Sequence, residues 1–289
     1  MPRKIQFVDE STGWLIGSIG QQCGNSPCPN VVMRTTDAGR TWERTSTTSA
    51  DLVDLSFASH RDGWVLGRQC ATPSTCKAVL VSTQSDGQSW TNQELPVTGA
   101  LQLDRASPAI GWIGGIENGR AVLLGTRDDG KTWERIGLPC GEGAVAFDFQ
   151  SRADGWLVCS GSTQTRPGDD TVYRTADAGQ TWRAVSSVAV AQANDRQSGG
   201  APRVIHVSSS DAWILDGRGN VLVTRDGGKS WEIVLKAGGP LVGATLVDGM
   251  HGWAVGGQTI WRTNDAGRTW TKLPINGGSA RASVTMRVE

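Results

Sequence analysis

The chain has 289 residues, and its 28 Lys and Arg residues balance its 28 Asp and Glu residues, so the formal net charge is zero at pH 7. A chain without a net electrostatic field is not steered toward nucleic acid or anionic membranes, and neither is expected as a partner. Hydrophobic residues make up 38% of the sequence without a long apolar run, which argues against a membrane-spanning helix and suits short strands joined by tight turns.

Two short phrases recur along the chain. The first contains Asp, then Gly, then a hydroxyl residue beside Trp, as in Asp37-Ala-Gly39-Arg-Thr41-Trp42, and it appears six times at intervals of 39 to 49 residues. The second is Gly-Trp, with Ala212 replacing Gly in one copy, and it precedes each copy of the first by 17 to 28 residues. Repeats of this length are typical of radial or stacked arrays. Twelve of the 13 tryptophans occupy these two slots, which indicates a structural role.

Each repeat predicts four strands, A to D in chain order. Strand A alternates apolar and polar residues, strand B begins at Gly-Trp, and strands C and D flank the Asp-x-Gly hairpin. The predicted fold is all-β, a six-bladed β-propeller of four-stranded antiparallel blades, forming a single domain over residues 1–289. The expected blades are residues 4–47, 51–96, 100–138, 144–187, 203–236 and 241–273, and a further strand is expected at 280–288.

The hairpin phrase has a structural explanation. Aspartate accepts hydrogen bonds from nearby backbone N–H groups, glycine supplies a positive φ, and the tryptophan covers the turn. The hairpin residues assigned this role are Asp37, Gly39, Trp42, Asp128, Gly130, Trp133, Asp177, Gly179, Trp182, Asp226, Gly228, Trp231, Asp265, Gly267 and Trp270. The second copy has Ser85 in place of Asp, so a looser turn is expected there. A calcium loop would need alternating carboxylates, and no metal or other cofactor is expected.

The six cysteines fall into three pairs, and an even count is typical of oxidised, secreted chains. Disulfides are therefore expected between Cys23 and Cys28, Cys70 and Cys76, and Cys140 and Cys159. Zinc is the alternative, but the three histidines lie apart from the cysteines in the sequence. The sequence starts without an apolar leader, yet the cysteines favour an extracytoplasmic or secreted location.

The hairpin phrase resembles the Asp-box, or BNR repeat. Together with Gly-Trp it is similar to the photosystem II assembly and stability factor family and its bacterial relatives, over residues 4–273. The resemblance implies a non-catalytic binding or assembly-scaffold propeller whose partner is a protein, and a monomer is expected. Members of that family have seven blades, whereas this sequence shows six.

Candidate binding residues come from two observations. The B–C and D–A connections share one face of the predicted propeller and carry the long insertions, where binding residues tend to lie. The polar candidates there are Arg166, Asp169, Asp170, Asn194, Asp195 and Arg196. In addition, Arg105 and His206 occupy a slot, seven residues before the Gly-Trp tryptophan, that is apolar in the other four repeats. The structural alternative is solvated polarity for the loop residues, local pairing for Arg105, for example with Asp104, and a satisfied core histidine for His206.

No catalytic residue is predicted, but Asp-boxes also occur in sialidases and other glycosidases. Tyr173 is the single tyrosine and occupies a core slot nine residues before its box tryptophan, so it is a poor nucleophile candidate. A carbohydrate-active protein, either a glycosidase or a lectin-like module, is the alternative function. It would need two carboxylates across a cleft. The available ones are Asp51, Asp54, Asp104, Asp148, Asp169 and Asp170.

Overall fold

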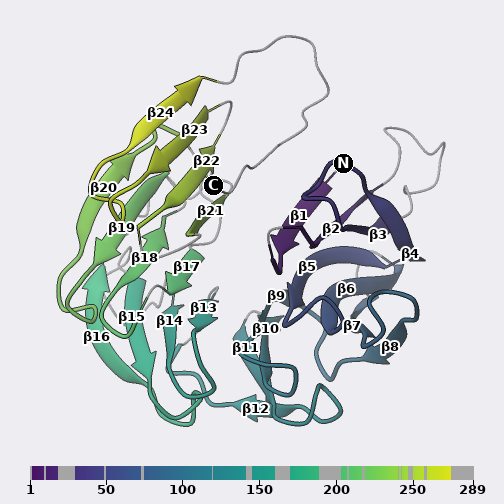
Figure 1. Ribbon diagram of the computed structural model, residues 1–289. Coiled ribbons are helices and arrows are strands. Elements are labelled where there is room, and N and C mark those ends of the chain that lie inside the picture. The colour runs from purple at the N-terminus through teal and green to yellow at the C-terminus, as the bar shows by residue number, and fades with distance from the viewer. Residues whose placement is uncertain are drawn as a thin grey trace. The chain divides into compact units, whose positions relative to one another are not determined.

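The computed structural model describes residues 2–9, 11–18, 30–48, 50–72, 75–118, 120–140, 145–159, 170–188, 203–206, 208–216, 219–239, 241, 243–246, 250–256 and 259–274. Over these residues the chain forms six four-stranded antiparallel sheets and no helix (Figure 1). Each sheet pairs its four strands in chain order. The predicted six-bladed β-propeller is confirmed. Among the described residues no helix could cross a membrane.

The strands of blades 1 to 3 are β1 (Pro2–Phe7), β2 (Gly13–Ser18), β3 (Asn30–Thr35), β4 (Glu43–Thr48), β5 (Asp51–Phe57), β6 (Gly63–Thr72), β7 (Thr75–Thr83), β8 (Thr91–Glu94), β9 (Ala100–Arg105), β10 (Gly111–Glu117), β11 (Arg120–Thr126) and β12 (Glu134–Ile136). Those of blades 4 to 6 are β13 (Val145–Phe149), β14 (Gly155–Cys159), β15 (Asp170–Thr175), β16 (Arg183–Val188), β17 (Arg203–His206), β18 (Ala212–Leu215), β19 (Asn220–Thr224), β20 (Glu232–Lys236), β21 (Gly243–Leu246), β22 (Gly252–Gly256), β23 (Thr259–Thr263) and β24 (Thr271–Pro274).

The blades fall into two compact units, blades 1 to 3 and blades 4 to 6. In the first unit β1 contacts β5, and β5 contacts β9; in the second, β13 contacts β17. Strand A of one blade therefore lies against strand A of the next. The predicted single domain stays a prediction, and the strand expected at 280–288 lies outside the described residues.

Tryptophans form the seams between consecutive blades. The Gly-Trp tryptophan of one blade meets the box tryptophan of the next, with ring centroids 6.1 Å apart for Trp14 and Trp90 and 5.6 Å apart for Trp64 and Trp133. The second unit repeats this contact in the pairs Trp156–Trp231, at 6.0 Å, and Trp213–Trp270, at 5.5 Å. The recurring indoles thus pack adjacent blades together, and such aromatic pairs stabilise beyond the area they bury.

The glycine of Gly-Trp makes room for a phenylalanine of strand A. A Cβ at Gly63 would lie 1.9 Å from the ring of Phe57, and one at Gly155 would lie 2.5 Å from the ring of Phe149. Phe57 in turn stacks on Trp14 of the preceding blade at 4.3 Å. Only a residue without a side chain fits beneath the phenylalanine, so the two slots are sterically linked.

Side chains also link the inner strands of the first unit. The Gln6 amide donates to the Phe57 carbonyl at 3.2 Å and accepts from the Phe57 N–H at 2.8 Å. Asp54 is buried in β5, where its carboxylate accepts the Leu103 N–H of β9 at 2.9 Å and pairs with Lys4 of β1. One carboxylate therefore connects three consecutive blades.

Candidate functional site

The Asp-box carboxylates accept hydrogen bonds from residues of their own turns. Asp37 accepts hydrogen bonds from the Thr41 hydroxyl at 2.6 Å, the Thr41 N–H at 2.8 Å and the Thr35 hydroxyl at 2.8 Å. These bonds, the Thr41 hydroxyl foremost, lower the pKa of Asp37 to about 2. The corresponding aspartates are bound in the same way, and the pKa is about 2 for Asp128, Asp226 and Asp265 and lowered for Asp177. The box carboxylates are therefore anionic turn elements.

The second box closes in the same way through a serine. Ser85 accepts the Ser89 N–H at 2.9 Å and shares a hydrogen bond with the Ser89 hydroxyl at 2.7 Å. The Thr83 hydroxyl accepts the Gly87 N–H at 3.1 Å, as its counterparts do in the other boxes. One hydroxyl oxygen replaces two carboxylate oxygens, and the contact between the Thr83 and Ser85 hydroxyls lengthens to 3.4 Å, against 2.8 Å between Thr35 and Asp37. The looser turn predicted from the sequence is therefore seen in this one contact, while the other bonds keep the turn closed.

In the first unit, an arginine on a Gly-Trp indole pairs with a carboxylate of a box turn. Arg34 lies over Trp14, 5.7 Å from the ring centroid, and bridges to Asp86 of blade 2 at 2.6 Å. Asp86 occupies the position directly before the box glycine, which we call the pre-glycine slot. This slot has a positive φ in every box; Asp86 has a φ of 61° and Asp129 one of 63°.

Arg105 makes a similar contact within the seam between blades 2 and 3. Its guanidinium lies 3.8 Å from the Trp64 ring centroid and donates to the Pro108 carbonyl and to Asp129, the latter at 3.4 Å. The side chain is 0% exposed, and burial lowers the pKa of Arg105 to about 10 despite the opposing effect of Asp129. Arg105 is therefore enclosed, and its side chain pairs with Asp129.

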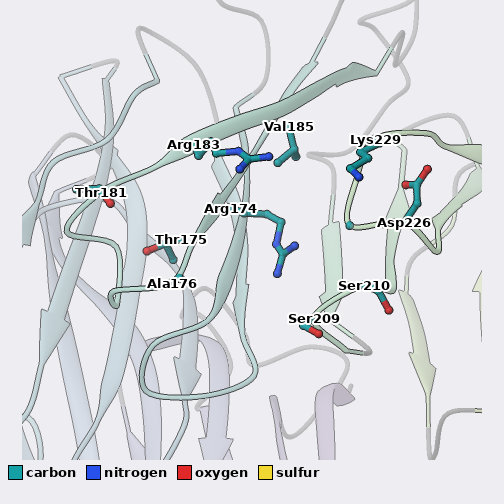
Figure 2. A pocket seen from close by; sticks show the side chains of 11 residues that line it. Arg174, Thr175, Ala176, Thr181, Arg183, Val185, Ser209, Ser210, Asp226 and Lys229 are labelled. Carbon is teal, nitrogen blue, oxygen red and sulfur yellow. The ribbon is translucent and has the colours of Figure 1, made fainter.

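A groove lies between blades 4 and 5 in the second unit. Its volume is about 510 Å³, and it is bordered by the ends of β15 and β16, the β17–β18 turn and the Asp-box turn of blade 5. Figure 2 shows Arg174 and Arg183 extending from blade 4 toward the turn that carries Lys229. We call this the blade 4–5 groove. Its remaining lining residues are Thr175, Ala176, Thr181, Val185, Ser209, Ser210, Asp226 and Gly227.

The blade 4–5 groove carries excess positive charge. Three of its lining residues are cations, and Asp226 is its one carboxylate among the lining residues. The Asp226 oxygens already accept the Ser230 hydroxyl at 2.6 Å, the Ser230 N–H at 3.0 Å and the Thr224 hydroxyl at 2.9 Å. The arrangement therefore suits an anionic group, for which guanidinium groups offer paired donors.

Most of the binding residues predicted from the sequence lie outside the described part of the chain. Arg166, Asp169, Asn194, Asp195 and Arg196 lie outside the described residues, as do the side chains of Asp170 and His206. The backbone of Asp170 begins β15, and that of His206 ends β17. The blade 4–5 groove is instead built from A–B and C–D turns, the face opposite to the predicted one.

Sequence reasoning missed the groove because two of its cations, Arg174 and Lys229, occupy positions where other repeats also have Arg or Lys. Two signals could have found it. Arg183 follows its box tryptophan, where the other repeats have Glu or Thr. Gly227 occupies the pre-glycine slot, where the other repeats have Ala or Asp.

Two of the three expected disulfides are present, Cys70–Cys76 and Cys140–Cys159. Cys70 and Cys76 are direct cross-strand partners in the β6–β7 hairpin. Cys23 and Cys28 lie outside the described residues. Within the part of the chain that the structure describes, no group of His, Cys, Asp and Glu is arranged to hold a metal ion.

Comparison with known proteins agrees with this architecture. Similar solved structures include YCF48 bound to D1 peptide (19% identity, 94% of this chain and 81% of that chain, TM-score 0.61) and YCF48 from Cyanidioschyzon merolae (18%, 95% and 85%, TM-score 0.63). The GH74 xyloglucanase from Xanthomonas campestris is also similar (15%, 91% and 45%, TM-score 0.64), and this chain spans less than half of it. Identities this low show the fold alone.

A comparison of the sequence with models of protein families shows which family the chain belongs to. No curated protein matches the chain. Residues 45–212, more than half of the chain, match the family model described as photosynthesis system II assembly factor YCF48. The resemblance predicted from the two repeated phrases is confirmed, and the chain belongs to the YCF48 photosystem II assembly factor family.

Proposed function

We propose that this chain is a non-catalytic, protein-binding propeller of the assembly-scaffold type and that it contacts its partner at the blade 4–5 groove. The observation that carries the proposal is a groove of about 510 Å³ lined by Arg174, Arg183 and Lys229, whose one lining carboxylate is committed to its own turn. A solved relative is described as bound to D1 peptide, which supports a polypeptide as the ligand class.

The contacts of two candidate carboxylates, Asp51 and Asp54, support a non-catalytic role. Asp51 pairs with Arg68 at 2.8 Å, and Asp54 pairs with Lys4 and two backbone N–H groups. A glycosidase needs one carboxyl group as acid and a second as base or nucleophile, facing each other across the sugar. Asp51 and Asp54 are engaged in structural contacts, and the likeness to a xyloglucanase at 15% identity is a likeness of fold.

The proposal has two further parts, a second contact surface and the location of the protein. We also propose a second contact surface made by the loops at 20–30, 69–77, 161–170 and 187–202, which the sequence predicts on one shared face; most of these residues lie outside the described ones. The Cys70–Cys76 and Cys140–Cys159 disulfides support an extracytoplasmic location, because such bonds persist in oxidising compartments.

The test combines capture with an activity assay. The immobilised chain is exposed to an extract of the cells that produce it, and bound proteins are quantified against an unrelated propeller. In parallel the chain is incubated with xyloglucan and a panel of aryl glycosides. We expect reproducible enrichment of a small set of proteins and no sugar release above blank. Turnover of any glycoside, or the absence of enriched proteins, would contradict the proposed function.

A further inference from the structure

The seam between blades 1 and 2 contains a built-in example of how an indole-stacked arginine is neutralised. Arg34 lies on Trp14 and pairs at 2.6 Å with Asp86, which stands in the pre-glycine slot of the next blade. The Asp86 backbone is fixed by its N–H, which donates to the Arg61 carbonyl of the A–B turn at 3.3 Å. Arginine, indole and carboxylate thus form a unit across the seam.

The seam between blades 4 and 5 contains the same unit without its carboxylate. Arg174 lies 4.8 Å from the Trp156 ring centroid, and the pre-glycine slot of blade 5 is Gly227, with a φ of 76°. The Gly227 N–H donates to the Ser210 carbonyl at 2.9 Å, so the backbone of the slot is anchored to the A–B turn as in blade 2. The position is therefore equivalent, and only the acidic side chain is missing.

Arg174 faces this vacancy directly. A Cβ added at Gly227 would have a single neighbour within 4 Å, the Arg174 Nη1 atom at 3.1 Å. The Nε atom of Arg174 is buried and has no hydrogen-bond partner in the described structure, but the same holds for Nε of Arg34, so the two seams differ in the carboxylate that pairs with Arg34. An anionic acceptor entering the groove would supply the corresponding charge-assisted bond to Arg174.

We propose that the blade 4–5 groove binds a carboxylate of an acidic segment of the protein partner, which takes the place that the Asp86 side chain holds in blade 2. This proposal rests on the proposed function and adds the chemistry of the partner. Arg183 and Lys229 border the same groove and would attract neighbouring acidic residues, while the Ser209 hydroxyl can bond to the backbone of the segment.

The key variant is Gly227→Asp, which supplies the missing carboxylate from the chain itself. Asp86 and Asp129 adopt a positive φ in the same slot, so the backbone of blade 5 accommodates Asp. The matched control is Gly227→Asn, which has nearly the same shape without the charge and also tolerates a positive φ. Arg183→Gln is a second variant, which removes one cation of the groove and leaves the turn that contains Gly227 unchanged.

Binding is measured by fluorescence anisotropy with a labelled nine-residue peptide rich in Asp and Glu, and with its Asn and Gln counterpart. We expect the acidic peptide to bind the wild type, Gly227→Asp to weaken that binding about tenfold or more, and Gly227→Asn to change it less than about threefold. Gly227→Asp should also raise the melting temperature, because the new carboxylate pairs with Arg174.

Three results would overturn the proposal: equal binding by Gly227→Asp and the wild type, equal loss in the Asp and Asn variants, or equal binding of the acidic and neutral peptides. The proposal would also be overturned if inorganic phosphate displaced the labelled peptide at the same concentration as unlabelled acidic peptide does, because the groove would then be a general anion site. If Gly227→Asp still captures the partner proteins from extract, the groove chemistry is wrong while protein binding stands. If the wild type captures none, the proposed function itself fails.

Discussion

Each Asp-box aspartate stabilises its turn as an anion. In Asp128 the carboxylate accepts the Thr132 hydroxyl at 2.6 Å, the Thr132 N–H at 2.9 Å and the Thr126 hydroxyl at 2.8 Å. Bonds to the charged form lower the pKa, here to about 2 from the usual 3.8. The turn geometry is therefore linked to pH.

This linkage predicts acid sensitivity with a defined sign. Because the folded-state pKa of Asp37, Asp128, Asp226 and Asp265 lies below that of the unfolded chain, their contribution is complete above about pH 4 and is lost as the pH falls toward about 2. Asp128→Asn should lower stability at pH 7 and reduce the loss between pH 4 and 2. Urea unfolding at a series of pH values measures both. An unchanged pH dependence in the Asn variant would contradict the assignment.

A second residue-scale prediction concerns the glycine beneath phenylalanine. Gly63→Ala places a Cβ 1.9 Å from the Phe57 ring and should destabilise by about 1–3 kcal/mol, as overpacking does. Gly137→Ala is the matched control, since a Cβ there meets nothing within 4 Å. In a Phe57→Leu background, Gly63→Ala should be better tolerated. Chemical denaturation gives the free energies of unfolding; equal effects of Gly63→Ala and Gly137→Ala would rule out the steric explanation.

At the scale of the element, strand A connects blades through polar side chains as well as apolar packing. Asp54→Ala leaves the Leu55 and Leu103 N–H groups without their acceptor in a buried position. We expect a loss of about 2 kcal/mol or more, since bonds to a charged group contribute about 1.5–3 kcal/mol each. Asp51→Ala is the control because the Asp51–Arg68 pair is more than one third exposed, and such a pair contributes about 1 kcal/mol or less. Similar losses in both variants would refute this role of Asp54.

The elements were predictable because their signals are local. The Gly-Trp and Asp-x-Gly phrases mark strand starts and the C–D hairpin, and the observed β2, β6, β10, β14 and β22 all begin at the glycine of Gly-Trp. The seams were not predictable in detail. The contact of Trp14 with Trp90 and the pairing of Arg34 with Asp86 depend on how one blade lies on the next, and no sequence pattern links residues so far apart in the chain.

At the scale of the whole molecule, the repeats predicted the number of blades and the order in which the strands of each blade pair, but they did not predict the groove. The groove lies where blade 5 has Gly227 in the pre-glycine slot, which holds Asp in blades 2 and 3 and Ala in blades 1, 4 and 6, and an absent side chain is not conspicuous in a chain with 38 glycines. Loop length pointed to the opposite face instead. Long insertions are a general sign of binding regions, whereas a missing counter-charge becomes visible only when equivalent seams are compared.

The two disulfides differ in the length of chain they close, which predicts unequal effects. Cys140–Cys159 spans 19 residues and Cys70–Cys76 spans 6. The chain-entropy model gives about 3 kcal/mol for the first and about 2 kcal/mol for the second. Replacing each pair with serines and measuring urea unfolding should reproduce this order. A larger loss from the Cys70/Cys76 replacement would contradict it.

The claim that the partner binds at the blade 4–5 groove is tested most directly by site-specific photocrosslinking. A photoreactive residue replaces Ser210, which lines the groove, or Lys236, at the far end of β20 from the Asp-box turn. Each protein is irradiated in extract, and the crosslinked segments are sequenced. We expect the Ser210 position to capture segments rich in Asp and Glu and the Lys236 position to capture none of them. Crosslinks from Lys236 alone, or segments from Ser210 without acidic residues, would contradict the claim.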